Sequence, residues 1–356
     1  MILIFTANTD GGVVQFCVQM VSELTKMKEA CVALLPDGAI VSIHDEIKDK
    51  IQFYTKVKSI SVHSPGIQEI ANKVCSMNPK VIWYMDATIL SCQLCSYLKN
   101  ECKQFLTIHD PAGDHPTNNV GIYDKVKAIL LRNIRRNAMK AASKIVLLSK
   151  NSKEQFDAIN GAYTTKSDIL RLGAHVPDVP EEQLEELVNE QGYILFFGRI
   201  DKYKGIINLL KAFQQNRSNI TRKIVIAGKG TLTEEEKRII TDNTDSILLI
   251  QRYINDAEMI WLFKNASCTV LPYIEASQSG VLSISYYFGK PVIVSDLEGL
   301  TEFVEDGKTG VVVHSVQELG KALAAVPSRG ESMRTAIESY YYNELEWSRN
   351  LKRIFS

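Results

Sequence analysis

A stretch between residues 273 and 296, YIEASQSGVLSISYYFGKPVIVSD, places a carboxylate beside the start of a helix. Glu275 is followed by small polar residues up to Ser279 and Gly280, and the pattern then becomes that of a helix ending at a Gly-Lys-Pro turn. Backbone N–H groups at a helix N-terminus bind anions. The stretch therefore predicts an anion site at Ser279 and Gly280, with Glu275 facing the group that carries the anion.

Two cations follow another predicted strand. In YILFFGRIDKYKGIINLLKAF the apolar run ends at Gly198, Arg199 and Lys204 flank a turn, and a helix follows from about Gly205. Arginine offers a planar fork and lysine a compact charge, which together suit a diphosphate. A solvated basic turn would have the same residues, and Lys202 is interpreted in that way. If both loops address one anion, they outline a sugar-nucleotide site.

Two loops in the first half could add to such a site. Gly11 and Gly12 follow the first predicted strand, where a double glycine lets the backbone approach a ligand, although a tight turn alone explains them equally well. The GxGxxG dinucleotide pattern is not met. His109 and Asp110 follow a later strand, and a histidine beside an acid at a buried strand's end is well placed for chemistry. His115 is interpreted as a loop residue.

The elements that must position these residues alternate along the chain, with short apolar runs between longer amphipathic stretches. The predicted strands are 2–5, 31–35, 60–62, 81–84, 105–108, 145–148, 193–197, 223–227, 247–250, 268–271, 291–294 and 310–313. The prediction is an α/β protein of two doubly wound domains facing a central cleft, because open parallel sheets bind ligands at the carboxyl ends of their strands. The expected divisions are an N-terminal domain at 1–172, a linker at 173–190, a C-terminal domain at 191–335 and a final helix at 336–356 that returns to the first domain.

Composition excludes several classes of protein. The 356 residues suffice for two domains, and 45% hydrophobic with 23% charged residues is typical of a globular protein. Zero formal net charge gives no reason to expect nucleic-acid binding. The sequence has neither a run of about 20 apolar residues nor the basic start of a signal peptide, so the expected location is the cytoplasm. Among seven scattered cysteines, the CxxC of Cys92 and Cys95 lies in a predicted helix and is interpreted as buried thiols.

Four segments together carry a family resemblance. They are GG at 11–12, HD at 109–110, GRIDKYKG at 198–205 and LPYIEASQSGVLSISYYFGKPVIVSDLEGLTEFVEDGKTGVVV at 271–313. Through them the chain resembles the retaining glycosyltransferases of family 4, of the bacterial polysaccharide-assembly type, which have the GT-B fold. The segments span nearly the whole chain in the expected order, and the last is the most specific. The resemblance implies sugar transfer from a nucleotide-diphosphate donor, a UDP- or GDP-sugar, to a glycan acceptor that is lipid-linked.

The resemblance assigns residues to four parts of the site. The donor's phosphates would be held by Gly12, Arg199, Lys204, Ser279, Gly280 and Val281. The catalytic positions would be His109, beside the transferred sugar, and Glu275. The base and ribose would be lined by Gly228, Tyr253, Ile254 and Ser283, and the acceptor side by Gly11, Asp110 and Gln278.

One departure from the family lies in the last segment. The family carries two glutamates eight positions apart, the second of which binds the ribose hydroxyls. Counting on from Glu275 gives Ser283, and counting back from the Gly-Lys-Pro turn gives Ile284, so neither position is acidic. The grip on the ribose, the identity of the base and the register of Glu275 therefore stay open.

Three further expectations concern chemistry and partners. No Asp-x-Asp pair stands at a predicted strand end, so Arg199 and Lys204 are expected to replace a metal's charge, with no cofactor besides the donor itself. Residues 123–144 combine helical apolar spacing with seven basic residues, which fits a helix on an anionic membrane surface; a core helix with a solvated basic face fits equally. The alternatives to a transferase are a non-catalytic GT-B partner subunit and a sugar-nucleotide epimerase, although an epimerase would need a pair of acid–base carboxylates.

Overall fold

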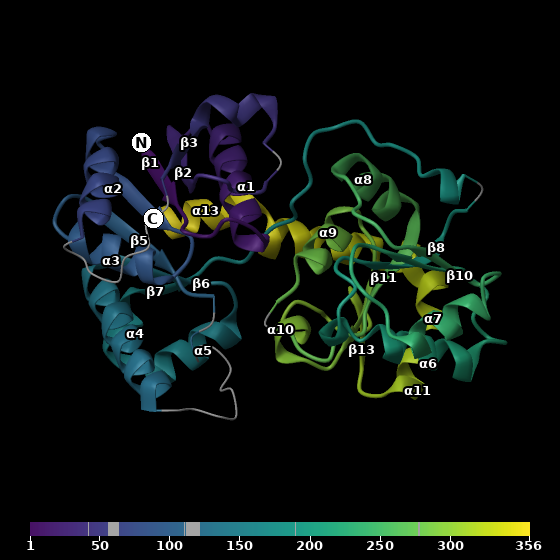
Figure 1. Cartoon of the computed structure of the whole chain (residues 1–356). Coiled ribbons are helices and arrows are strands. Elements are labelled where there is room, and N and C mark those ends of the chain that lie inside the picture. Colours follow the sequence, from purple (N-terminus) through teal and green to yellow (C-terminus); the bar gives the residue numbers. More distant parts are fainter. Residues whose placement is uncertain (42, 56–63, 110, 112–121, 189, 277) are drawn as a thin grey trace. The chain divides into compact units, whose positions relative to one another are not determined.

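The computed structural model describes residues 1–41, 43–55, 64–109, 111, 122–188, 190–276 and 278–356. Within these residues the chain forms two compact units, each with one parallel sheet and helices between its strands (Figure 1). The first unit consists of Met1–Leu170 and Leu351–Ser356, and the second of Arg171–Asn350. The two-domain α/β architecture predicted from the alternating pattern is confirmed.

The first unit's described strands have the order β3-β2-β1-β4-β5-β6-β7. The strand order reverses between β1 and β4, and ligands of open α/β sheets bind beyond the carboxyl ends of strands at such a switch point. The elements, in chain order, are β1 (Ile2–Phe5), α1 (Gly12–Lys26), β2 (Cys31–Pro36), η1 (Asp45–Lys50), β3 (Ile51–Tyr54), α2 (Pro65–Ser76), β4 (Val81–Tyr84), α3 (Ile89–Tyr97), β5 (Lys103–Thr107), α4 (Ile122–Ala141), β6 (Lys144–Leu147), α5 (Lys150–Ile159), η2 (Gly161–Lys166) and β7 (Ser167–Ile169).

The second unit's described strands have the order β10-β9-β8-β11-β12-β13, with the switch point between β8 and β11. The elements are η3 (Glu185–Leu187), β8 (Tyr193–Phe197), η4 (Lys202–Lys204), α6 (Ile206–Asn216), β9 (Ile224–Ala227), α7 (Glu234–Thr241), β10 (Ile247–Ile250), α8 (Asp256–Asn265), β11 (Ala266–Leu271), α9 (Gly280–Tyr287), β12 (Val292–Ser295), α10 (Glu298–Thr301), β13 (Gly310–Val313), α11 (Val316–Ala325), η5 (Val326–Arg329), α12 (Gly330–Tyr340), η6 (Tyr341–Leu345) and α13 (Trp347–Phe355).

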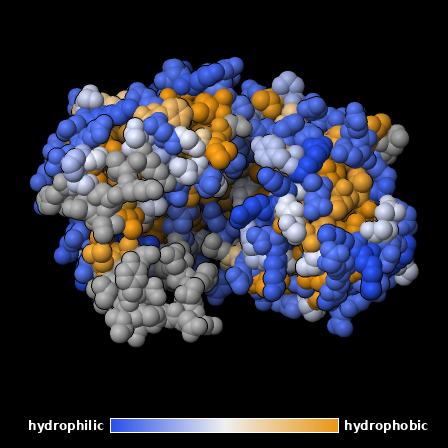
Figure 2. Space-filling model, viewed as in Figure 1, coloured by the Kyte–Doolittle hydropathy of each residue, from blue (hydrophilic) through white to orange (hydrophobic). Residues whose placement is uncertain are grey.

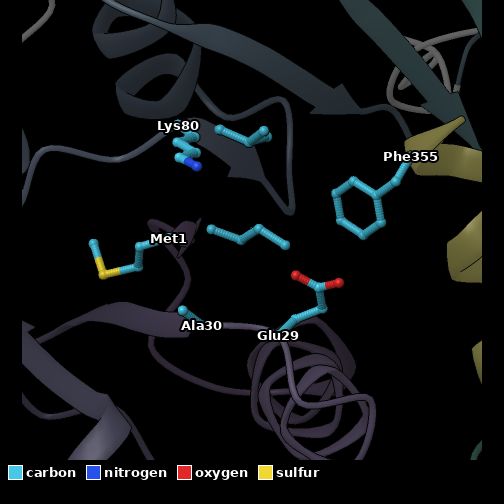
Figure 3. A pocket seen from close by; sticks show the side chains of 7 residues that line it. Met1, Glu29, Ala30, Lys80 and Phe355 are labelled. Carbon is cyan, nitrogen blue, oxygen red and sulfur yellow. The ribbon is translucent and has the colours of Figure 1, made fainter.

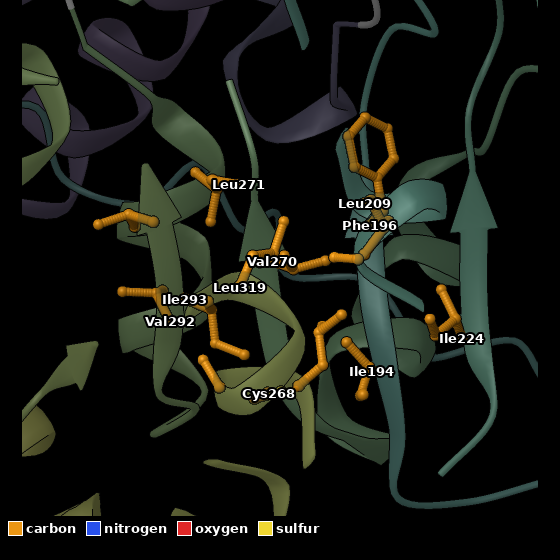
Figure 4. Close-up of a cluster of buried hydrophobic side chains, with 14 of the residues drawn as sticks. Ile194, Phe196, Leu209, Ile224, Cys268, Val270, Leu271, Val292, Ile293 and Leu319 are labelled. Carbon is orange, nitrogen blue, oxygen red and sulfur yellow. The ribbon is translucent and has the colours of Figure 1, made fainter. Parts of the chain in front are cut away.

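The central strands of the second unit are apolar on both faces, because helices cover both. Along β8, Ile194 and Phe196 belong to one buried cluster, whereas Tyr193 and Leu195 belong to another on the opposite face. Figure 4 shows the first cluster, in which side chains of β8, β11 and β12 gather with Leu209 of α6 and Leu319 of α11. This packing fixes the ends of β8 and β11, from which the candidate site loops emerge.

Two edge strands were missed by the sequence prediction. β3 has buried residues only at its two ends, and β7 is the half-buried tripeptide Ser-Asp-Ile, so neither forms an apolar run. The predicted strand at 60–62 lies outside the described residues. The other predicted strands are confirmed to within two residues at each end.

The chain passes between the units at residues 170–171 and again at 350–351. The amide of Asn350 donates to the carbonyl oxygen of Arg171 at 3.2 Å, so both passages are joined within the second unit. At the end of α13, the ring of Phe355 packs against Trp83 and Phe105 in the first unit, with centroid distances of 5.6 and 5.9 Å. The final residues are therefore part of the first unit's core.

Candidate active site

The loop after β8 is held against the loop after β11 by backbone contacts. Gly205 has a φ of 66°, and a Cβ there would lie 1.9 Å from the carbonyl oxygen of Pro272. The N–H of Ile274 donates to the carbonyl oxygen of Tyr203 at 2.8 Å. Only glycine permits this approach at position 205, since it tolerates positive φ and has no Cβ. The two loops at the switch point of the second sheet are thus in direct contact.

Lys204 lies between two aromatic rings. Its Nζ is 3.7 Å from the ring centroid of Tyr273 and 5.1 Å from that of Tyr203. Arg199 donates to the hydroxyl of Tyr203 at 3.1 Å, and within the described residues no carboxylate forms an ion pair with either cation. Rings attract a cation without neutralising it. The site therefore carries two positive charges that are available to an anion.

Burial lowers the pKa of Lys204 to about 8, helped by the nearby charge of Arg199 and opposed by Asp201. A diphosphate binds the protonated lysine, whose fraction falls as the pH rises through that value. We therefore expect kcat/KM for the donor, which reports the free enzyme, to fall between about pH 7 and 9. A pH series with saturating acceptor measures this, and the fall should disappear in Lys204→Ala. A flat profile in the unaltered enzyme would contradict it.

The start of α9 is joined to this pair through Tyr273. Ser279 is the N-cap of α9, and its hydroxyl lies 3.2 Å from the hydroxyl of Tyr273. Gly280 is exposed, with no atom within 4 Å of where its Cβ would be. A Cβ at Gly198 would lie 3.8 Å from Val281. The structure thus brings together the cations and the helix start that the sequence analysis assigned to one anion.

The other residues expected in the second unit differ in their accessibility. Glu275 is exposed and Gln278 half-buried on the loop between β11 and α9. Tyr253, after β10, is 61% exposed, whereas Ile254 is buried in the core. Gly228 has a φ of 153°, and its Cβ would lie 1.8 Å from the carbonyl oxygen of Gly198. The need for glycine at 228 thus comes from the chain's own backbone.

Ser283 is turned toward the protein. Its side chain is 5% exposed, and its hydroxyl donates to the carbonyl oxygen of Leu172 at 2.9 Å. The alternative register position, Ile284, is also buried, at 8% exposed. The second turn of α9 therefore uses both positions for packing, and the donor capacity of Ser283 is already taken by Leu172.

In the first unit, His109 follows β5 and is fixed by a backbone group. Its Nε2 lies 2.8 Å from the carbonyl oxygen of Met85. A carbonyl only accepts, so Nε2 carries the proton and Nδ1 of the neutral ring is an acceptor. Gly11, with a φ of 78°, and Gly12 begin α1 and are both exposed. Asp110 and His115 lie outside the described residues.

Asp86 is a residue that the sequence analysis missed. It follows β4 at the switch point of the first sheet and is 3% exposed. Its carboxylate accepts hydrogen bonds from the loops after β1 and β4 and from the first turn of α3; the donors are the hydroxyls of Thr6, Thr88 and Ser91, the amide of Asn8 and the N–H groups of Ala7 and Thr88. The sequence did contain a signal for it, because Asp86 is an acid that follows the apolar strand VIWY after one intervening residue. Asp86 thus joins the loop after β1, which leads to Gly11, to the loop after β4.

Other features lie away from these loops. A cavity of about 340 Å³ in the first unit is lined by Met1, Glu29, Lys80 and Phe355 among others, at the amino ends of β1 and β4, which is the opposite edge of the sheet (Figure 3). Cys92 and Cys95 are buried, and their thiols donate to the carbonyl oxygens of Ala87 and Ala138, as the interpretation as buried thiols requires.

The surface shown in Figure 2 is mostly hydrophilic, with hydrophobic areas scattered between. Among the described helices, none combines the length and the apolarity needed to cross a bilayer. In the described residues, no group of three or more histidine, cysteine, aspartate or glutamate side chains is arranged to hold a metal ion.

Comparison with known sequences finds a family-model match within the second unit. Residues 180–342 match the family model "Glycosyl transferases group 1". The chain is 22% identical over 245 residues to the capsular polysaccharide biosynthesis glycosyltransferase CapM of Staphylococcus aureus, covering 62% of this chain and 63% of that protein. It is 31% identical over 148 residues to the lipopolysaccharide 1,2-N-acetylglucosaminetransferase of Salmonella typhimurium, covering 37% of this chain and 38% of that one. The chain thus spans less than two thirds of the length of these relatives.

Comparison with solved structures extends over both units. The structure of Anabaena HepE in complex with UDP matches with a TM-score of 0.75 at 13% identity, covering 99% of this chain and 98% of that one. A glycosyltransferase of Rickettsia africae matches with a TM-score of 0.70 at 16% identity, covering 99% and 96%.

Two parallel α/β units of this kind, matched over their whole length by such neighbours, define the GT-B fold of glycosyltransferases. Within that fold, the match to the glycosyl transferases group 1 model lies in the second unit, at residues 180–342. The predicted GT-B fold is confirmed.

Proposed function

We propose that this protein is a retaining glycosyltransferase that moves a sugar from a nucleotide-diphosphate donor to a glycan acceptor. The observation that carries the proposal is the pair Arg199 and Lys204, two cations without a carboxylate partner in the described residues, joined through Tyr273 to the start of α9. A diphosphate would complete this arrangement, because it supplies the negative charge that the protein does not.

The same groups would act on the leaving group. Departure of a nucleoside diphosphate builds charge on the β-phosphate while the sugar ring becomes oxocarbenium-like. Arg199, Lys204 and the N–H groups of Gly280 and Val281 would stabilise that charge where it develops. The acceptor would attack from the same face, assisted by the leaving phosphate, which retains the anomeric configuration. Such a site needs no metal, so EDTA should leave the rate of transfer unchanged.

The sugar and acceptor would be bound by residues outside the cation pair. Because Nε2 of His109 is committed to Met85, its Nδ1 is the atom that would accept from a hydroxyl of the transferred sugar. Glu275 is assigned to the same sugar, while Gly11 and Gly12 offer exposed backbone to the phosphate or the acceptor. The exposed ring of Tyr253 would flank the base. A UDP- or GDP-sugar is the proposed donor, supported by the UDP in the HepE structure.

We further propose that the acceptor is a lipid-linked glycan in capsule, exopolysaccharide or O-antigen assembly, on the inner face of the cell membrane. The names of CapM and of the lipopolysaccharide transferase support this class of acceptor. Helix α4 supports the membrane contact, since Arg132, Arg136 and Lys140 are exposed and spaced four residues apart along it. Positions four apart share one face of a helix.

Reversing the charges of α4 should weaken binding to anionic vesicles. Each basic residue near such a surface contributes about 1 kcal/mol, so the triple variant R132E/R136E/K140E should bind at least about 100-fold more weakly. A matched variant, K211E/K237E/K321E, changes the net charge equally at exposed positions of the second unit. Sedimentation with phosphatidylglycerol vesicles measures both, and equal binding of the two variants would reject the α4 surface.

The proposed function is tested by thermal unfolding with UDP, GDP, ADP and their common sugar conjugates. A ligand at 100 times its dissociation constant stabilises the fold by about 2.7 kcal/mol. We expect a clear shift with one diphosphate, which names the base of the donor, and no shift in Lys204→Ala. An unchanged melting temperature with every nucleotide would reject the proposed donor site.

A non-catalytic GT-B partner subunit is the second candidate function. The observation that favours it is Ser283, whose hydroxyl is bonded to Leu172 at the position where the family resemblance places a ribose-binding glutamate. Such a subunit would bind a nucleotide without consuming its sugar conjugate. Measuring consumption of the sugar conjugate therefore distinguishes this subunit from a transferase.

A further inference from the structure

We infer that Tyr273 is a positioning residue of the diphosphate site: its ring holds Lys204 and its hydroxyl holds Ser279, so that one side chain sets the lysine and the start of α9 relative to each other. The inference rests on the proposed function, because it names the group that organises that site.

The ring of Tyr273 is a fixed platform. The side chain is 3% exposed, and Nζ of Lys204 lies 3.7 Å from the ring centroid. The backbone next to both side chains is also fixed, because Gly205, which follows Lys204, packs directly on Pro272, which precedes Tyr273. A lysine that is already held loses less side-chain freedom when it binds an anion. The platform should therefore favour binding of the diphosphate.

The hydroxyl of Tyr273 contacts Ser279 at the start of α9. In the same unit, the N-caps Thr233 and Asn255 accept hydrogen bonds from the first turns of their own helices, α7 and α8. The side chain of Ser279, the N-cap of α9, makes no such bond, and its hydroxyl lies 3.2 Å from that of Tyr273. Tyr273 thereby keeps the Ser279 hydroxyl from capping the first turn of α9, which begins with the N–H groups that the diphosphate is proposed to use.

The alternative is that Tyr273 only packs the core, and Tyr286 provides the matched comparison. Tyr286, which is also in α9, is buried at 0% exposed, and its hydroxyl donates to Thr309 at 2.8 Å. In the described part of the chain it makes no hydrogen bond or ring contact with Arg199 or Lys204. Each Tyr→Phe change removes one buried hydroxyl bond and keeps the ring. Both variants should therefore lower the melting temperature, and only Tyr273→Phe should alter the binding of a diphosphate.

The experiment is isothermal titration of UDP, GDP and ADP into the full chain, followed by titration of the one that binds into Tyr273→Phe, Tyr286→Phe, Ser279→Ala and the Tyr273→Phe/Ser279→Ala double variant. We expect Tyr273→Phe to raise Kd about 3- to 10-fold, the effect of one hydrogen bond, and Tyr286→Phe to leave it unchanged. The double variant should bind no more weakly than the weaker single variant, since both changes remove the same bond.

The outcomes separate the inference from the function on which it rests. If the unaltered chain binds none of the three diphosphates, the proposed function fails and the inference fails with it. If it binds one, and Tyr273→Phe and Tyr286→Phe bind alike, the donor site stands and the positioning role of Tyr273 is rejected. Additive losses of affinity in the double variant would likewise show that Tyr273 does not act through its bond to Ser279.

Discussion

Replacing Lys204 with alanine is expected to lower kcat/KM for the nucleotide-sugar donor by about 30- to 1,000-fold, the loss of about 2–4 kcal/mol in the transition state. Of the two cations in the site, Lys204 lies closer to an aromatic ring, with its Nζ 3.7 Å from the centroid of Tyr273. Its charge is not balanced by an ion pair in the described residues, so removing it leaves no buried carboxylate without a partner. The loss should therefore appear in function rather than in folding.

Stability provides a second readout of the same change. Burial lowers the pKa of Lys204 to about 8, so at pH 7 the folded protein holds a charge that the fold disfavours. Ligand-free Lys204→Met should then melt no lower than the unaltered chain at pH 7, although it no longer binds the diphosphate. Lys202→Ala is the matched control, because this lysine is exposed on the same turn. Near-normal kcat/KM in Lys204→Ala, or an equal loss in Lys202→Ala, would contradict the assignment.

Gly205→Ala is expected to destabilise the second unit by about 2–5 kcal/mol or more. The residue has a φ of 66°, which costs an alanine about 1–2 kcal/mol, and its Cβ would lie 1.9 Å from the carbonyl oxygen of Pro272. Relieving that overlap must move the loop after β8 away from the loop after β11, at a cost of about 1–3 kcal/mol or more. For a unit of this size, each kcal/mol lowers the melting temperature by about 2–4 °C.

Gly307 provides the matched control for Gly205. It also has a positive φ, 74°, but no atom lies within 4 Å of where its Cβ would be. Gly307→Ala should therefore cost only the conformational part, about 1–2 kcal/mol. Differential scanning calorimetry of the two variants isolates the contact with Pro272. Equal melting temperatures would show that the two loops are not held together at this point.

The parallel sheets could be predicted from the sequence because their central strands are uninterrupted apolar runs. β1, β4 and β8 carry buried residues on both faces, and such apolar runs can be recognised in the sequence without knowing which strands they pair with. The edge strands β3 and β7 could not, since an edge strand is only partly covered and its sequence is mixed.

The arrangement inside the candidate site could be predicted only in part from the sequence. Arg199, Lys204 and the start of α9 could be chosen by residue type and by their position after predicted strands. The bridging role of Tyr273 could not, because it depends on a ring contact with one loop and a hydroxyl contact with another. The same holds for Ser283, whose bond to Leu172 joins residues 111 positions apart. Glycines 205 and 228 were read as sites of ligand approach or helix entry, yet both meet the chain's own backbone.

The central claim is sugar transfer from a nucleotide-diphosphate donor, and its most direct test is a transfer assay. UDP- and GDP-sugars would be incubated with the protein and extracted lipid-linked glycans, with mass spectrometry of the glycans and NMR of the new anomeric linkage. We predict a gain of one sugar with retained configuration and an equal release of nucleoside diphosphate, both lost in Lys204→Ala. Nucleotide binding without transfer would instead identify a non-catalytic subunit, and conversion of the free donor into an epimer would contradict the transferase altogether.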